Sequence, residues 1–120
     1  MRELTDSIVI TLSQQTIKER RGGLRQIIQE WRDSDGEKNT WWYKCGTAPK
    51  VEIINVYWVI GGRVRWKSKL LQVERDKWMM FSPGTPMYGK CWLILFDFEP
   101  IPRRDQVDMK GFQGFRYYYE

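Results

Sequence analysis

The residues whose types and spacing most clearly suggest a binding site are four cations spaced by two along the chain, Arg63, Arg65, Lys67 and Lys69, close to Trp58. Residues spaced by two on a β-strand point to the same face of the sheet. A row of cations can follow a phosphate backbone, and an aromatic ring beside it can stack on a base. This spacing indicates binding of RNA or a nucleotide through Trp58 and the four cations. The same pattern also fits the solvated side of a sheet, with Arg65 lying over Trp58 in a cation–π contact.

A β-hairpin is expected to position these side chains. Two β-rich runs, residues 54–60 and 63–73, meet at Gly61-Gly62, a dipeptide suited to the positive φ angles of a two-residue turn. Counting outward from the turn pairs Ile60 with Arg63, Val59 with Val64, Trp58 with Arg65, Tyr57 with Trp66, and Val56 with Lys67. One face is then expected to be core and to hold Tyr57, Val59, Val64 and Trp66. The other face carries the cations beside Val56, Trp58 and Ile60.

Further aromatic residues are candidates for stacking or for a pocket. Arg116 would share a strand face with Tyr118, so it is a further candidate contact to nucleic acid. Its neighbours Phe115, Tyr117 and Tyr119 share the other face, where core packing is the alternative. Trp41 and Trp42 point to opposite faces of their strand, so one is expected in the core while the other can line a pocket or lie on the surface. The pocket candidates are therefore Trp41, Trp42 and Tyr118.

The composition permits a polyanionic partner without requiring one. The 120 residues carry a net charge of +5, and residues 61–120 hold 11 Lys/Arg and 7 Asp/Glu against 9 and 8 in residues 1–60. This length suits a single domain spanning residues 1–120. The seven tryptophans suit either a bulky β core or a stacking surface.

Several catalytic and metal-binding arrangements are excluded. The chain has no histidine, which removes Ser-His-Asp and Cys-His sites and the commonest metal ligand. Cys45 and Cys91 form no close-spaced zinc pair, and we expect them to be buried, reduced thiols, since a disulfide needs an oxidising compartment. Asp97 and Glu99 would share one strand face. This pair of carboxylates could serve acid–base chemistry or bind a metal, or it could simply mark the solvated end of a strand. We expect no catalytic set, no cofactor and no metal.

The remaining elements are short. Strands are predicted at 7–12, 40–45, 91–98 and 112–119. Apolar residues at helical spacing predict a helical segment at 13–31, which Ser13 caps at its start. Gly22-Gly23 is expected to break this segment, which leaves a firm helix at 24–32. A phase slip predicts either a β-bulge near Leu70-Leu71 or a strand that turns a barrel corner, and residues 74–77 are predicted to form a charged turn. Together these elements predict an α+β fold, a small mixed β-barrel with one or two helices near the N-terminus.

The uncharged run that begins at Cys91 is far shorter than the ~20 residues of a membrane helix. The sequence also shows no signal peptide. We therefore expect a cytoplasmic protein that does not enter a membrane.

The end of the chain, Glu99-Pro100-Ile101-Pro102 followed by residues 109–117 (MKGFQGFRY), together with the hairpin, resembles small prokaryotic and phage proteins with the PUA-like fold, the group that includes ASCH domains. The resemblance implies a β-barrel with helices packed on it, and many such proteins bind RNA or modified bases, while a few are enzymes. The ASCH signature G-x-K-x-x-E-x-R is not matched by residues 18–23 (KERRGG), so no catalytic or ligand-binding set is carried over.

Three functional hypotheses follow. The first is a non-enzymatic PUA-like module that binds RNA or a nucleotide through cations and aromatics. The second is a protein-interaction module of phage or bacterial origin that uses exposed Trp and Tyr as anchors. The third is a small hydrolase that acts on a modified nucleobase, which needs a lysine and a carboxylate within hydrogen-bond reach in a pocket. The oligomeric state is not determined by any of these patterns.

Overall fold

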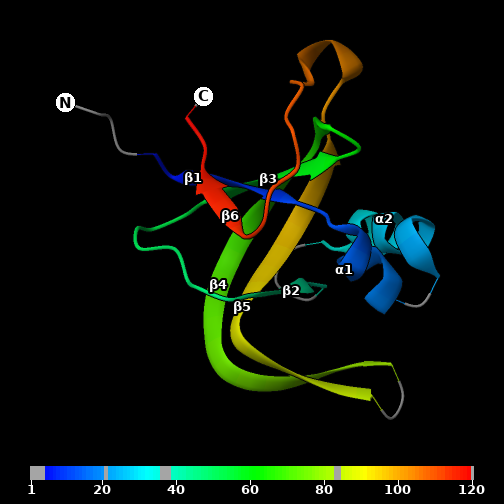
Figure 1. Ribbon diagram of the computed structural model, residues 1–120, viewed down its shortest axis with the longest axis vertical. Helices are drawn as coiled ribbons and strands as arrows, with labels where there is room; N and C mark the ends of the chain where they lie inside the picture. The colour runs from blue at the N-terminus through cyan, green and yellow to red at the C-terminus, as the bar shows by residue number, and fades with distance from the viewer. Residues whose placement is uncertain (1–4, 21, 36–38, 83–84, 120) are drawn as a thin grey trace.

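A computed structural model describes residues 5–20, 22–35, 39–82 and 85–119 of the chain. Figure 1 shows a strongly curved sheet with two helices packed on one side. The elements in chain order are β1 (Ser7–Thr11), α1 (Gln14–Glu19), α2 (Gly23–Asp33), β2 (Trp41–Cys45), β3 (Asn55–Ile60), β4 (Arg63–Ser82), β5 (Thr85–Pro100), a 3-10 turn (Arg103–Asp105) and β6 (Phe115–Tyr117). This arrangement confirms a small mixed fold of helices near the start and strands thereafter.

The described strands form one six-stranded sheet with the order β2-β5-β4-β3-β1-β6. Strands β1 and β3 pair in parallel, and the other neighbours pair antiparallel. The order is linear, with β2 and β6 at its two ends, so the described strands do not show the closed barrel that was expected. Bending of the two longest strands, β4 and β5, produces the curvature instead (Figure 1).

The helical region follows the sequence prediction. The Ser13 hydroxyl accepts a hydrogen bond from the amide of Thr16, which satisfies one of the free donors at the start of α1. The predicted break is confirmed, because α1 ends at Glu19 and α2 begins at Gly23, and both Gly22, the N-cap of α2, and Gly23 have positive φ angles. No helix in the described parts of the chain is long and apolar enough to cross a membrane.

An aromatic core lies between α2 and the sheet. Trp31 of α2 is fully buried and stacks on Phe98 of β5, with ring centroids 4.6 Å apart. Three further indoles surround Trp31 at centroid distances of 5.1 to 5.6 Å: Trp41, Trp58 and Trp66. Aromatic side chains bury large apolar areas and favour such edge-to-face and offset contacts. Much of the chain's tryptophan therefore serves the core rather than a binding surface.

The predicted hairpin register is correct only next to the turn. Ile60 pairs with Arg63 and Val59 with Val64, but the register then shifts by one residue, so that Trp58 pairs with Trp66 rather than with Arg65. A β-bulge on β4 beside Arg65 explains the shift, because it inserts one residue into only one strand. The bulge turns Trp66 to the same face as Trp58, where both reach Trp31. The expectation that Trp66 shares a face with Tyr57 is therefore wrong.

Strands β4 and β5 extend past the rest of the sheet as a two-stranded arm, which comprises residues 77–82 and 85–90 (Figure 1). The predicted charged turn at 74–77 is wrong, because β4 continues through it and bends at Asp76, whose φ is 50°. The predicted bulge near Leu70-Leu71 is confirmed by a register shift between Leu70 and Gln72. Residues 83–84, between β4 and β5, lie outside the described residues.

Gly89 allows the arm to pack against the body. A Cβ atom placed on Gly89 would lie within 3.0 Å of the indole ring of Trp92, whose Nε1 donates to the backbone oxygen of Lys77 at 2.8 Å. Replacing Gly89 by alanine should lower the free energy of unfolding by about 1–3 kcal/mol, because the ring must move and its hydrogen bond is strained. Urea denaturation measures this effect.

The matched control is Gly46→Ala, at a glycine where an added Cβ meets no atom within 4 Å. Its effect should stay within about 0.5 kcal/mol. Equal effects of the two substitutions would contradict the packing described for Gly89.

Candidate nucleic-acid interface and pocket

Trp58 does not form part of a surface. Its side chain is 0% exposed and packs against Trp31, Trp41 and Tyr43. Its Nε1 donates to the Ser68 hydroxyl at 3.0 Å, which satisfies the buried donor. A base has no access to this ring, so Trp58 cannot act as the predicted stacking residue.

Two of the predicted cations lie in one row across the sheet face opposite the helices, where Val9 and Tyr57 form part of a second small hydrophobic cluster. Directly paired residues point to the same face of a sheet, and the register pairs Arg116 with Val9, Val9 with Tyr57, and Tyr57 with Lys67. Three strand spacings separate Arg116 from Lys67, a distance of about 14 Å. Lys69 lies two residues further along β4 and therefore on the same face.

The predicted pocket residue Tyr118 also belongs to this face. Its ring packs on Tyr57 with centroids 4.7 Å apart, and the Nζ of Lys67 lies 5.6 Å from the Tyr57 ring. The guanidinium of Arg116 lies 4.4 Å from the ring centre of Phe112. Tyr57 is buried beneath these groups, whereas Tyr118 is half-buried and accessible. We call this surface the basic aromatic face and define it by Tyr57, Lys67, Lys69, Arg116 and Tyr118.

The other two predicted cations stand apart from that row. Arg63 pairs with Ile60 on the core side of the sheet, and its Nε lies 3.4 Å from Oδ1 of Asp108 without an aligned hydrogen bond. Arg65 is exposed at the bulge, and its backbone oxygen accepts from the amide of Ile101 at 2.8 Å. The four predicted cations therefore do not share one face.

Carboxylates border the basic aromatic face on the β5 side. Lys69 Nζ lies 3.8 Å from Oδ2 of Asp97, and Glu99 pairs directly with Lys67. Both side chains of the Lys69–Asp97 pair are partly exposed, so the pair contributes only about 0–1 kcal/mol. Such a weak pair can exchange for a phosphate contact at little cost.

The other two pocket candidates, Trp41 and Trp42, do line one cavity. Its volume is about 380 Å³, within the range of small-molecule sites. The cavity lies between the helices, β2 and the arm, and its lining comprises Arg20, Glu30, Asp33, Ser34, Asn39, Thr40, Trp41, Trp42, Met79 and Met80. Trp41 is 4% exposed and belongs to the core, as expected for one of the two, while Trp42 is half-buried, and both side chains border the cavity.

Internal hydrogen bonds hold the polar groups of this pocket. A carboxylate oxygen of Glu30 accepts from Nε1 of Trp41 at 3.1 Å, and the Thr40 hydroxyl accepts from Nε1 of Trp42 at 3.2 Å. Arg20 donates to the backbone oxygen of Trp42 at 2.8 Å and lies 4.5 Å above the Trp41 ring. The pocket therefore joins indole walls to two carboxylates and one guanidinium, a set that suits a planar ligand bearing hydrogen-bond donors.

Sequence reasoning missed most of the pocket residues. Glu30 and Asp33 lie three residues apart on α2, and that spacing alone would have placed them on one helix face. No local signal points to Met79 and Met80, because only the bend of the arm brings them to the pocket.

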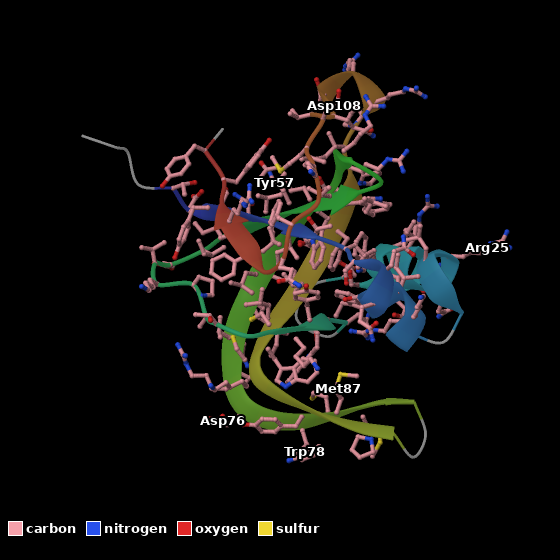
Figure 2. The ribbon with its side chains drawn as sticks, in the orientation of Figure 1. Arg25, Tyr57, Asp76, Trp78, Met87 and Asp108 are labelled. Atoms are coloured by element: carbon pink, nitrogen blue, oxygen red, sulfur yellow. The ribbon has the colours of Figure 1, made fainter. Side chains whose placement is uncertain are left out.

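The outer side of the arm exposes large apolar side chains. Trp78 is 65% exposed and Tyr88 42%, and their rings lie 5.4 Å apart. Figure 2 shows Trp78 pointing away from the body of the molecule and Met87 pointing toward it. The Tyr88 hydroxyl donates to Asp76 at 2.6 Å, and this hydrogen bond raises the pKa of the phenol.

No protein-family model matches the chain, and no curated protein or solved structure matches it either. Among the described residues, no group of three or more His, Cys, Asp or Glu side chains could hold a metal ion. A functional proposal for the chain therefore rests on its own residues and their geometry.

Proposed function

We propose that the protein binds RNA or a nucleotide through the basic aromatic face. The observation that supports this most strongly is the row across the sheet, in which Lys67 and Arg116 flank the rings of Tyr57 and Tyr118, which pack on each other at an angle of 44°. These residues come from distant parts of the sequence. Cations beside an accessible ring are the combination that single-stranded nucleic acids bind.

In this proposal each part of the face has a separate role. Lys67, Lys69 and Arg116 contact phosphates, which supplies affinity that does not depend on sequence. A base stacks on the open side of Tyr118, whose other side is supported by Tyr57. Because the ring is already packed, stacking costs little further ordering of the side chain.

A PUA-like relationship remains part of the proposal. It is supported by the curved mixed sheet with helices on one side and by the resemblance of residues 99–102 and 109–117 to that group. A shared fold alone does not establish a shared activity. The basic aromatic face, and not the resemblance, therefore carries the assignment.

Removal of the Tyr118 ring tests the proposal. Tyr118→Ala should weaken binding of a labelled single-stranded oligonucleotide by about tenfold or more, since a base–aromatic stack contributes about 1–3 kcal/mol. Tyr118→Phe keeps the ring and should bind nearly as well as the parent protein. Fluorescence anisotropy at low salt measures both affinities. If the alanine variant binds with unchanged affinity, Tyr118 does not stack on the ligand.

A second candidate function, protein interaction, is favoured by the exposed arm. Trp and Tyr are the residue types that most often anchor protein interfaces, and Trp78 and Tyr88 lie side by side on the outer side of the arm. The occupant in this case is a protein that covers both rings. In a pull-down, one partner protein that is still recovered after nuclease treatment, but is no longer recovered by the Trp78→Ala variant, would support this function. If the Trp78→Ala variant recovers the partner as well as the parent protein does, this function is contradicted.

The third hypothesis, a hydrolase for a modified nucleobase, gains no support from the pocket. Its described lining includes the carboxylates of Glu30 and Asp33 but no lysine. A second cavity, of about 330 Å³, does have a lysine and a carboxylate in its lining, Lys69 and Glu52, but Lys69 pairs with Asp97 at 3.8 Å.

A further inference from the structure

The chain's two cysteines face each other across neighbouring strands. Cys45, the last residue of β2, pairs directly with Cys91 of β5 in an antiparallel register, and both are free thiols. Directly opposed residues in antiparallel strands have Cα atoms about 4.5–5.5 Å apart. That separation lies within the range of about 4.4–6.8 Å that disulfides span, so a bridge would require no large backbone movement.

The two thiols differ in their access to solvent. Cys91 is buried at 2% exposure, whereas Cys45 is half-buried. An external reagent can therefore reach the pair through Cys45. Burial raises the pKa of the Cys45 thiol, and the hydrogen bond to Cys91 raises it further, while the nearby amide of Thr47 and the charge of Arg75 act in the opposite direction. The Cys45 thiol is thus held in its neutral form and reacts slowly.

We propose that Cys45 and Cys91 are a dithiol modification site that closes into a cross-strand disulfide by exchange with a low-molecular-weight disulfide such as oxidised glutathione. The inference does not depend on RNA binding. It uses only the register of β2 on β5 and the different burial of the two sulfur atoms.

The exchange balances without any other reactant. The Cys45 sulfur loses its proton and attacks one sulfur of the small disulfide, which forms a mixed disulfide and expels one small thiolate that takes up the proton. The Cys91 sulfur then loses its proton and attacks the Cys45 sulfur, which forms the Cys45–Cys91 bond and expels the second small thiol. The protein dithiol is oxidised to a disulfide, and the small disulfide is reduced to two thiols.

The Cys45–Cys91 disulfide would covalently link the edge strand β2 to its neighbour β5. Strand β2 lies at one end of the strand order and carries Trp41 and Trp42 of the pocket. A disulfide between residues 45 and 91 closes a long loop, which removes much conformational freedom from the unfolded chain. Closure should therefore stabilise the protein and fix the strand that forms one pocket wall.

The test treats the reduced, folded protein with oxidised glutathione at mildly alkaline pH. Intact-mass measurement should show loss of two hydrogen atoms, and thiol titration should show that both cysteines are consumed. The midpoint of thermal unfolding should rise by roughly 10 °C and return when dithiothreitol is added. The protein unfolded in urea, treated in parallel, shows that the reagent is active.

The control is Cys45→Ser, a conservative change at a half-buried position that should fold and show neither the mass change nor the thermal shift. Three results would overturn the proposal. They are a lasting glutathione adduct on Cys45 with Cys91 still free, a disulfide between two chains, and unreacted thiols in the folded protein while the unfolded protein reacts.

Discussion

Replacing Trp31 by alanine should lower the free energy of unfolding by about 3–5 kcal/mol, the usual cost of removing a large buried aromatic side chain. Trp31 is fully buried, and its ring contacts Phe98, Trp41, Trp58 and Trp66. The substitution leaves a cavity between α2 and the sheet that these rings cannot fill without leaving their present packing. Urea denaturation followed by far-UV circular dichroism measures the loss.

Two controls separate packing from a general effect of losing an indole. Trp31→Phe keeps an aromatic ring, and it also removes an indole N–H that has no hydrogen-bond partner among the described residues, so it should cost much less. Trp78→Ala removes an indole that is 65% exposed and should change stability by about 0.5 kcal/mol or less. A small effect of Trp31→Ala would show that Trp31 is not the centre of the core.

Reversing the charges of Lys67 and Arg116 together should lower affinity for a single-stranded RNA by more than tenfold. Each reversal removes a phosphate contact and places a carboxylate beside the phosphate, so each costs on the order of 1 kcal/mol or more. Arg116 is exposed and Lys67 is partly exposed, so we expect the fold to tolerate both substitutions. Anisotropy titrations of Lys67→Glu/Arg116→Glu against the parent protein measure the loss.

The matched control is Lys18→Glu/Arg25→Glu, which makes the same change in net charge on the helices. Figure 2 shows Arg25 at the outer end of the helical region, far from Tyr57 in the sheet. This control should lose only the small part of the affinity that depends on total charge. Equal losses in the two double variants would mean that the protein attracts RNA through its net charge and not through the basic aromatic face.

Local sequence patterns predict much of this fold because short-range rules govern those parts. Gly61-Gly62 forms the predicted turn, Ser13 caps α1, and Gly22-Gly23 separates the helices. In each case the residue type satisfies a local backbone requirement, such as a positive φ angle or a free amide. The bulge at Leu71 was also predictable, because an apolar residue changes phase there.

The bulge beside Arg65 could not be predicted in the same way. Residues 63–69 alternate between charged and uncharged side chains in both registers, so the local pattern does not distinguish them. The choice depends on Trp31, which lies far away in sequence and offers contacts to both Trp58 and Trp66 once Trp66 turns inward. Burial of two indoles outweighs the alternation of a surface strand.

The candidate site was predictable only in part for the same reason. Lys67, Lys69, Arg116 and Tyr118 were identified from residue type, and the strand order brings them to one face. Trp58 keeps its predicted face, but α2 covers that face through Trp31, and the bulge on β4 moves Lys67 and Lys69 to the opposite face. Arg20 and the two methionines of the pocket reach it through tertiary packing, which no spacing in the sequence encodes.

The most direct test of the central proposal is the salt dependence of RNA affinity for the parent protein and for Lys67→Glu/Arg116→Glu. With three cations on phosphates, the logarithm of the parent's association constant should fall linearly with the logarithm of salt concentration, with a slope of about −2. The double variant should bind more weakly and show a slope of about −0.7, because only Lys69 remains. No RNA binding at low salt, or an unchanged slope in the variant, would contradict the proposed interface.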